Sequence, residues 1–421
     1  MHTNMHMQTG TARVSQVAGL DYLVSNTSSG LSIRVEGYSH RLPLLLARVV
    51  TRLAEAQLCP ERFAVQLDLV RRGYVNFFSD DPMRHATYNT THLLELPRWH
   101  VSEYLSFTSD ATACSHAALV AFARPGGALL AQTFAEALWH GNTSAADAAD
   151  ATRSALAALR GAPLPPSQRP APRLLQLPAG VEVVVRQHAS LLGAECARHA
   201  NPEETNSAVE VYLQLGPDAR PGSLLLELLA RCLEQPFYQQ LRTEEQLGYL
   251  VHSGVRFDHG VVGLRMLVQS SEHDAAFLEA RIGAFLHRVP TLLGLMGAAD
   301  FRAHRQALIS QKLERDRSLA EETARHWAPI TLGTRDFERA RHDAAALRGL
   351  TQPQLRAFWA EFGAHGAPRR RYLASLVFAP RHVLPPPPDG AHVRCADGLP
   401  AVLALKNTLH AYPCPGPAQT E

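Results

Sequence analysis

The spacing of apolar residues in the first part of the chain alternates between the period of a strand and the period of a helix. Residues 20–25 and 30–37 alternate apolar and polar side chains around a turn rich in serine and threonine, which predicts a strand pair. Residues 134–142 predict another strand that ends in a turn, and Ser144 is a candidate N-cap for the helix that follows it. The predicted helices are residues 44–58, 61–78, 85–96 and 145–159.

The second part repeats this mixture with longer elements. Asp258-His259-Gly260 separates two apolar stretches and predicts a hairpin turn. Pro236 lies within a helical pattern at residues 224–240, where it predicts a break or a kink. Antiparallel strands mixed with long helices in both parts predict an α+β fold, with an irregular tail after the prolines at 385–388. The other predicted helices are residues 275–289, 301–315, 319–328, 337–347 and 354–362, and the predicted strands are residues 181–187, 208–215, 249–257, 261–270 and 372–378.

A segment at residues 161–172 contains five prolines, which remove backbone donors and disfavour both helix and sheet. Such a segment is typical of an extended connector, so it predicts the main domain boundary. We therefore expect a first domain at residues 1–160, a linker at 161–173, and a second domain with a C-terminal tail at 174–421. The length of 421 residues fits two or three domains, because one domain usually takes about 100–200 residues.

The composition is that of a soluble globular protein, with 46% hydrophobic and 19% charged residues. A net charge of +2 gives no indication of binding to nucleic acid or anionic membranes, and the longest apolar runs are too short to span a membrane. The six cysteines are scattered without a disulfide framework, and the N-terminus lacks the apolar region of a secretory signal. We therefore expect a cytoplasmic protein with no nucleic-acid or membrane partner.

The run at residues 241–251, Leu-Arg-Thr-Glu-Glu-Gln-Leu-Gly-Tyr-Leu-Val, carries the strongest candidate chemistry. On spacing alone, Arg242 pairs with one of the two glutamates that follow it, and Tyr249 packs within a strand. Residues 243–246 also match a capping box, which predicts a short helical turn.

This run lies in a longer block, residues 234–270, that closely resembles the last domain of zinc metallopeptidases of the insulinase (pitrilysin) family, which includes insulin-degrading enzyme and nardilysin. Looser matches to the third and fourth domains of that family are residues 35–46, 82–88, 139–142, 320–327 and 401–413. Together they run from about Gly19 to Pro413, so the chain resembles the C-terminal half of such an enzyme. The resemblance implies two domains, each an antiparallel-rich sheet packed with helices. Because only 18 residues precede Gly19, we expect the first domain to lack its N-terminal strands.

In that family the matching arginine and tyrosine bind the scissile carbonyl of a peptide, which implies this catalytic role for Arg242 and Tyr249. The family's zinc is held in the N-terminal half by an inverted motif, H-x-x-E-H, and a downstream glutamate. The one Glu-His pair of this chain is Glu272-His273, and Gln269 occupies the place of the motif's first histidine.

No other spacing of histidine, cysteine and glutamate in the chain is typical of a metal site; His2 and His6 are four residues apart but lack the motif's glutamate. We therefore expect no metal ligand and no cofactor in this chain. Zinc is expected in an N-terminal half, encoded by the same gene or supplied as a separate chain.

Two classes of function follow. One is the substrate-binding half of a metalloendopeptidase that cleaves small peptides and is inactive alone because H-x-x-E-H is absent. The other is a non-catalytic peptide-binding or assembly subunit, or a decayed paralogue. The chain has neither a G-x-x-x-x-G-K-[ST] phosphate loop nor a G-x-S-x-G nucleophile motif. An in-frame H-x-x-E-H domain encoded upstream would distinguish the two classes.

Overall fold

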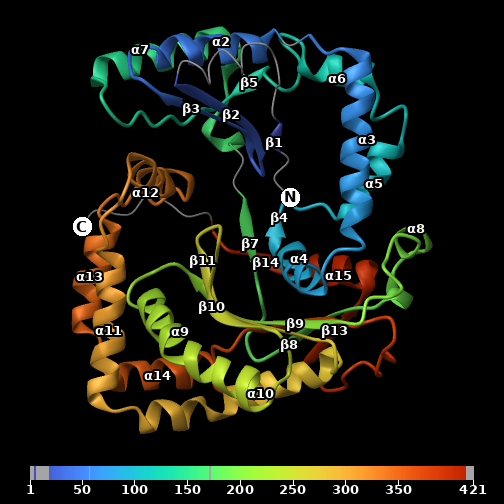
Figure 1. Ribbon diagram of the computed structural model, residues 1–421, viewed down its shortest axis with the longest axis vertical. Coiled ribbons are helices and arrows are strands. Elements are labelled where there is room, and N and C mark those ends of the chain that lie inside the picture. The colour runs from blue at the N-terminus through green and yellow to red at the C-terminus, as the bar shows by residue number, and fades with distance from the viewer. Residues whose placement is uncertain (1–3, 6–18, 56, 170–171, 414–421) are drawn as a thin grey trace. The chain divides into compact units, whose positions relative to one another are not determined.

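The computed structural model describes residues 4–5, 19–55, 57–169 and 172–413 (Figure 1). Its content of 48% helix and 19% strand confirms the predicted α+β class. The chain forms two compact units, each assembled from segments that are distant in sequence. Unit 1 comprises Met1–Gly73, Ser102–Pro172 and Asp316–Thr331, and unit 2 comprises Tyr74–Val101, Arg173–Arg315 and Leu332–Glu421. The domain boundaries expected from the proline-rich segment stay a prediction, and His2 and His6 lie outside the described residues.

Unit 1 contains the predicted strand pair as an antiparallel hairpin of β2 (Leu20–Thr27) and β3 (Gly30–Gly37). Helix α2 (Leu42–Ala54) packs against β3 and against α7 (Ala145–Leu159). Ser144 caps α7 as predicted, since its Oγ accepts a hydrogen bond from the Asp147 N–H at 3.1 Å. The other elements with most of their length in unit 1 are β1 (Asn4–Met5), α3 (Pro60–Phe77), α5 (Val101–Ser109), α6 (His116–Ala123), β5 (Gln132–Thr133), β6 (Ala162–Pro163) and α12 (Leu319–Thr331).

The strand predicted at residues 134–142 is wrong. Strand β5 ends at Thr133 and pairs with β6, which is only two residues long, and residues 134–140 have no regular structure. Alternating side chains favour an extended backbone, but a strand also requires a neighbour that takes up its backbone hydrogen bonds. The predicted bend is present at Gly141, where φ is 124°.

Unit 2 is organised around a six-stranded sheet in the order β10-β11-β9-β12-β8-β13. Strands β10, β11, β9 and β12 pair antiparallel, while β8 pairs in parallel with both β12 and β13. The strands are β8 (Glu182–Gln187), β9 (Ser207–Pro217), β10 (Leu250–Asp258), β11 (Val261–Ser270), β12 (Tyr372–Val377) and β13 (Val393–Asp397).

The predicted hairpin between β10 and β11 is confirmed. Asp258 pairs with Val261 across a two-residue turn formed by His259 and Gly260. Both turn residues have positive φ, 45° and 76°, which is the geometry of a type I′ turn. The turn therefore fixes the register of the strand that follows the Arg242–Tyr249 run.

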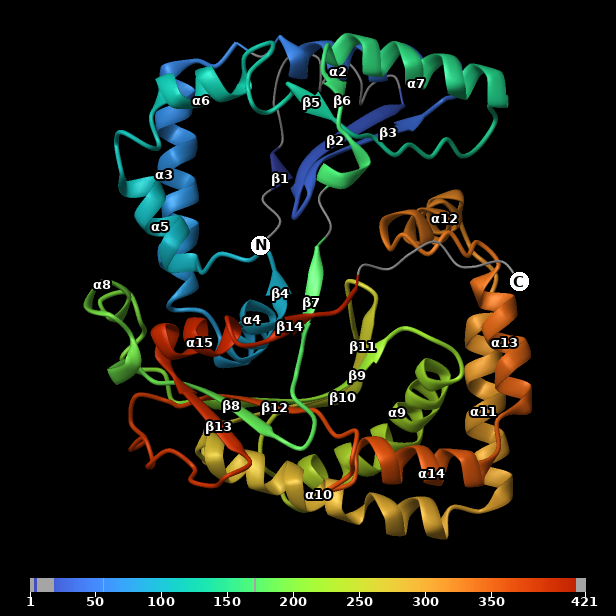
Figure 2. The same cartoon turned by 180° about the vertical axis from the view of Figure 1, so that it is seen from behind.

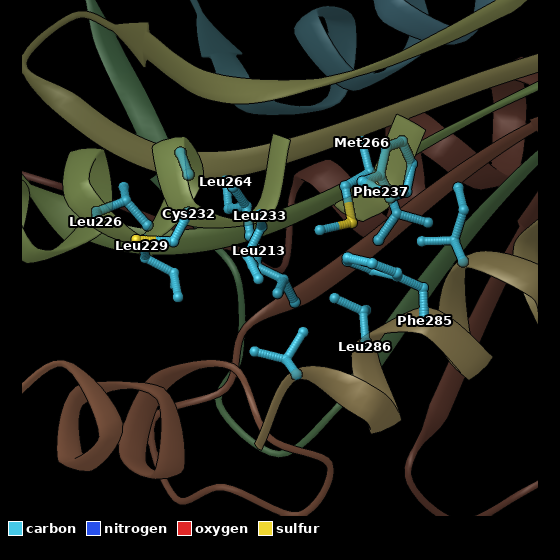
Figure 3. Packing of buried hydrophobic residues seen from close by; sticks show 14 of the residues in the cluster. Leu213, Leu226, Leu229, Cys232, Leu233, Phe237, Leu264, Met266, Phe285 and Leu286 are labelled. Carbon is cyan, nitrogen blue, oxygen red and sulfur yellow. The ribbon is translucent and has the colours of Figure 1, made fainter. Parts of the chain in front are cut away.

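Helices cover both faces of this sheet (Figure 2). Helices α9 (Gly222–Tyr238) and α10 (Ala275–Leu295) pack on one face, and α4 (Pro82–Leu94) and α15 (Gly398–Lys406) pack on the other. Strand β9 shows the division, because Val211 and Leu213 belong to the core under α9 whereas Tyr212 belongs to the core under α4. In the first core, side chains of α9 meet those of α10 and the sheet (Figure 3): Leu226, Leu229, Leu233, Phe237, Phe285, Leu286 and Met266.

The irregular tail predicted after residue 388 is wrong in part, since it contributes β13, α15 and the short strand β14 (His410–Ala411). Strands β14 and β4 (Glu95–Leu96) flank β7 (Arg173–Gln176) in a small antiparallel sheet. These elements are too short to show a clear period in the sequence. The remaining α-helices of the described residues are α8 (Ala194–Ala197), α11 (Ala298–Lys312), α13 (Arg339–Gly349) and α14 (Gln352–Phe362).

Among the described residues, no helix taken singly has the length and apolar character of a membrane span. Helices α10 and α11 reach that threshold only when counted together, and the pair is bent by 107°.

Candidate functional site

Arg242 lies in an uncommon helical turn at the end of α9. The α-helix continues through Pro236 to Tyr238, so it does not break at this proline, while the alternative of a kink there stays a prediction. The helix then widens into a π-helix at Gln239–Glu244. Single π-turns are rare and frequently occur at functional sites. Here the π-turn carries Arg242 at the point where the chain turns towards β10.

Glu245 fixes the end of the π-turn. Its carboxylate accepts hydrogen bonds from Arg281 Nε at 2.7 Å and Arg281 Nη2 at 2.8 Å, and another from Gln240 Nε2 at 2.7 Å. The hydrogen bonds from Arg281 are the main reason that the pKa of Glu245 lies below its ordinary value. The buried side chains of Leu241 and Leu247 hold the turn against the core.

The ion pair that spacing alone predicts for Arg242 is absent from the part of the chain that the structure describes. Glu245 is paired with Arg281 rather than with Arg242. Arg242 forms no ion pair with any residue that the structure describes, and its guanidinium carbon lies 5.3 Å from the centre of the Tyr249 ring. The guanidinium is thus held beside Tyr249 and keeps its hydrogen-bond donors available.

The capping box predicted at residues 243–246 is wrong. Thr243 and Glu244 are the last residues of the π-helix rather than the start of a new helical turn. Gln246 then has a φ of 52°, which no right-handed helix contains.

Gly248 positions Tyr249 by allowing a close approach between backbones. A Cβ atom on Gly248 would lie 1.8 Å from the backbone oxygen of Gln269 on the neighbouring strand β11. With no side chain there, the chain passes over the end of β11, and Tyr249 emerges with 83% of its surface exposed. The tyrosine therefore does not pack within a strand, contrary to the interpretation from spacing.

A pocket of about 450 Å³ lies between α9, β10 and α11. Its lining includes Glu234, Tyr238, His252 and His304, which offer both charged and aromatic contacts. Both α9 and β10 flank the π-turn, so the pocket shares its supporting elements with Arg242 and Tyr249.

The one group of three potential metal ligands among the described residues lies in unit 1 and comprises His140, Glu322 and His326. Spacing along the sequence does not reveal this group, because His140 is far from the other two residues in sequence. The feature of the sequence that indicates part of the group is the i, i+4 spacing of Glu322 and His326, which places both side chains on one face of a helix.

Two protein-family models match the chain. Residues 6–107 match the middle or third domain of peptidase M16, and residues 228–327 match the PQQ synthase PqqF-like C-terminal lobe domain 4. The second match contains both Arg242 and Tyr249.

Several curated proteins are similar along most of the chain. The insulin-degrading enzyme-like 1, peroxisomal protein of Arabidopsis thaliana is 31% identical over 378 residues, which is 88% of this chain and 37% of that protein. Insulin-degrading enzyme of Homo sapiens is 30% identical over 372 residues, 87% of this chain and 35% of that protein. The nardilysin-like protein of Arabidopsis thaliana is 28% identical over 367 residues, 86% of this chain and 34% of that protein. The chain thus spans little more than a third of the length of the relatives it matches.

Among solved structures, the crystal structure of pitrilysin superposes with a TM-score of 0.76 and 20% identity, covering 96% of this chain and 40% of that one. A protease from Helicobacter pylori superposes with a TM-score of 0.62 and 11% identity, covering 89% of this chain and 86% of that one. These two structures share the fold. With the sequence homology to insulin-degrading enzymes and nardilysins over 88% of its length, the chain belongs to the M16 (insulinase) family of peptidases.

Proposed function

We propose that this chain is the C-terminal, substrate-binding half of an insulysin- or nardilysin-like zinc metalloendopeptidase that cleaves small peptides. Arg242 and Tyr249 bind the carbonyl of the peptide bond that is cleaved. The observation that carries the proposal is the pairing of an exposed Tyr249 with Arg242, whose guanidinium carbon lies 5.3 Å from its ring centre while the nearby Glu245 is bound by Arg281.

The chemistry of the pair fits this role. Attack on a peptide carbonyl places negative charge on its oxygen, and donors already aimed at that oxygen stabilise the transition state. Arg242 supplies a permanent positive charge, and the Tyr249 hydroxyl supplies a neutral donor. Because the π-turn carries Arg242 and the closely packed Gly248 directly precedes Tyr249, the backbone that carries the pair is fixed and little reorganisation is required when the charge develops.

The residues of this chain do not fit the family's zinc. The sequence lacks H-x-x-E-H, and Gln269, at the position of the motif's first histidine, has a structural role. Its amide donates to Asp81 Oδ2 at 3.1 Å and its oxygen accepts from the Met83 N–H at 2.9 Å, which ties β11 to the start of α4. We therefore assign the peptidase zinc to an N-terminal half. The proposed setting is the cytoplasm, with peptides and that half as partners and no nucleic acid or membrane.

The proposal is tested by combining the chain with a zinc-bearing N-terminal half of an M16 relative and measuring cleavage of a fluorogenic peptide. Arg242→Ala and Tyr249→Phe should each lower kcat by roughly tenfold to a thousandfold, because a donor that acts on transition-state charge contributes mainly to kcat. The chain by itself should show no peptidase activity that a chelator removes.

Arg302→Ala on α11 is the matched control, since Arg302 is exposed and its Nε donates to the Ala298 carbonyl within its own helix. It should leave kcat unchanged. Peptide binding without turnover in the combined enzyme would favour the non-catalytic subunit instead. Unfolding of both site variants, with full activity in the folded fraction, would show that the pair only stabilises the turn.

A further inference from the structure

His140, Glu322 and His326 bring three potential metal ligands together within unit 1. One ligand atom from each lies within 4.8 Å of the other two. His140 Nε2 is 3.7 Å from Glu322 Oε2, and His326 Nε2 is 3.9 Å from Glu322 Oε1. We propose that this cluster binds Zn²⁺ or a chemically similar divalent transition-metal ion. In a tetrahedral zinc site with bonds of about 2.0–2.2 Å, neighbouring ligand atoms are about 3.4 Å apart, so modest side-chain rotations close the cluster around an ion.

The local fold explains why the three side chains meet. Helix α12 begins after Ser318, whose Oγ accepts a hydrogen bond from the Glu321 N–H at 3.2 Å. Glu322 and His326 are one turn apart on this helix and therefore share a face. His140 precedes the bend at Gly141 and faces them, with its ring centre 5.3 Å from that of His326.

Thr323 sets the tautomer of His140. The Thr323 hydroxyl donates its single proton to the Leu319 carbonyl at 2.7 Å, so its oxygen can only accept from His140 Nδ1 at 2.8 Å. Neutral His140 therefore carries its proton on Nδ1 and directs the lone pair of Nε2 towards Glu322. This is the supporting arrangement that metal-binding histidines usually have, in which the nitrogen that does not bind metal donates to a neighbouring group.

His326 Nε2 is also an acceptor. Arg325 Nη2 lies 3.4 Å from it, and a guanidinium can only donate. In both histidines the nitrogen within 4 Å of the Glu322 carboxylate, Nε2, thus carries a lone pair. Arg325 is at the same time the competing cation of the site, because its Nη2 lies 3.7 Å from Glu322 Oε1 while its Nε is bound to Asp316 at 2.8 Å.

The ligand set selects the class of ion. Two imidazoles and one carboxylate match zinc and its late first-row neighbours, whereas Ca²⁺ and Mg²⁺ prefer oxygen ligands alone. The side chains of His140, Glu322 and His326 are 21%, 43% and 28% exposed, so an ion can enter from solvent and keep water in a fourth position. A bound ion would join the Asp316–Thr331 segment to the preceding part of unit 1, which is far away in sequence.

The test is Zn²⁺ binding by the full chain after removal of metal, measured by competition with a chromophoric chelator. His140→Ala and His326→Ala should each weaken Zn²⁺ affinity about a hundredfold or more, and Thr323→Val by about tenfold to a hundredfold. Glu322→Gln keeps the size of the side chain and should also weaken binding. Arg325→Ala should strengthen it, because it removes the competing cation. Zn²⁺ should raise the Tm of the wild type but not that of His326→Ala.

His40→Ala is the control, since His40 is an exposed histidine of the same unit. The His40→Ala variant should bind Zn²⁺ with the affinity of the wild type. His2 and His6 are present in every variant, so any Zn²⁺ binding by these two residues is the same in all of them. Far-UV circular dichroism of the metal-free variants establishes that each is folded. Equal Zn²⁺ affinity in the wild type and His326→Ala, or no micromolar binding even in Arg325→Ala, overturns the proposal. The inference does not depend on peptidase activity, because no peptide enters the measurement.

Discussion

Gly248 is the residue on which the candidate site depends most directly, since a Cβ there would lie 1.8 Å from the Gln269 backbone oxygen. We expect Gly248→Ala to separate the start of β10 from β11 and to lower the free energy of unfolding by about 1–3 kcal/mol, as overpacking usually does. Urea unfolding of the purified chain measures this change. Gly254→Ala in β10 is the matched control, because its Cβ would approach His252 no closer than 3.5 Å and should cost far less. Equal stability of the two variants would contradict the close approach.

At the scale of the residue, the sequence identifies the side chains of the candidate site better than it predicts which residues contact them. The run at residues 241–251 singles out Arg242 and Tyr249 through its family resemblance, and the structure brings the two side chains together. The sequence does not show that Arg281 binds Glu245, because that contact depends on how α10 packs beside the π-turn. Spacing along the sequence therefore does not predict whether an ion pair neutralises the charge of Arg242.

At the scale of the element, apolar periodicity predicts most long helices and the central strands, because burial on one face imposes the period that the sequence displays. The failures share a physical cause. The strand expected at residues 134–142 lacks a pairing partner, and the short elements of the tail are held by neighbours rather than by their own pattern. The π-turn at Gln239–Glu244 also has no signal in the hydrophobic pattern.

Two histidines, His92 in α4 and His100 directly before α5, have pKa values below the ordinary range. Burial, with the neighbouring charges of His100, Lys406 and Arg98, lowers the pKa of His92 to about 3, and burial likewise lowers the pKa of His100 to about 4. Both values lie below the ordinary histidine pKa of about 6.5. Between pH 6.5 and 4 these two histidines therefore take up protons in the unfolded chain but not in the folded chain. Their contribution to the free energy of unfolding is full above about pH 6.5 and is lost as the pH decreases.

We expect each of these two histidines to contribute a loss of up to about 1.4 kcal/mol per pH unit over that window. Urea unfolding at pH 7.5, 6 and 5 measures the slope. His92→Phe keeps a ring beside Tyr88 and removes one titrating group, so the slope should be shallower. His392→Phe, at an exposed histidine of the same unit, should keep the wild-type slope. An unchanged slope in His92→Phe would show that His92 does not stay neutral.

At the scale of the whole molecule, each unit contains a segment from the part of the sequence that mainly forms the other unit. Tyr74–Val101 lies in unit 2, where α4 covers β9 and β12. Its docking depends on contacts between distant residues, such as Asn89 Nδ2 to Gln187 Oε1 at 2.9 Å and Arg256 Nη2 to Thr91 Oγ1 at 2.7 Å. A proline-rich segment indicates only a local break in regular structure and does not predict contacts between distant residues. The sequence therefore does not indicate that residues 74–101 belong to unit 2.

Arg256 joins this segment to the sheet through a buried charge. It is 6% exposed, lies 3.3 Å from Glu210, and also binds Asp258 and Thr91. Glu210 has no exposed surface, and the other arginine near its carboxylate is Arg265 at 3.6 Å. Arg256→Met should therefore leave a poorly compensated buried carboxylate and lower the free energy of unfolding by about 3–5 kcal/mol.

The control for this prediction is Arg369→Met, whose partner Glu361 is 3.9 Å away in a pair that is more than half exposed. Such a surface pair is worth about 0–1 kcal/mol, so the variant should unfold close to the wild-type midpoint in urea. If Arg256→Met also unfolds close to that midpoint, the pair with Glu210 does not hold the segment in place. The expected result is a large loss of unfolding free energy in Arg256→Met alone, with protease cleavage that appears first within residues 74–101. This result would show that one buried ion pair holds in unit 2 a segment that lies in the first half of the sequence.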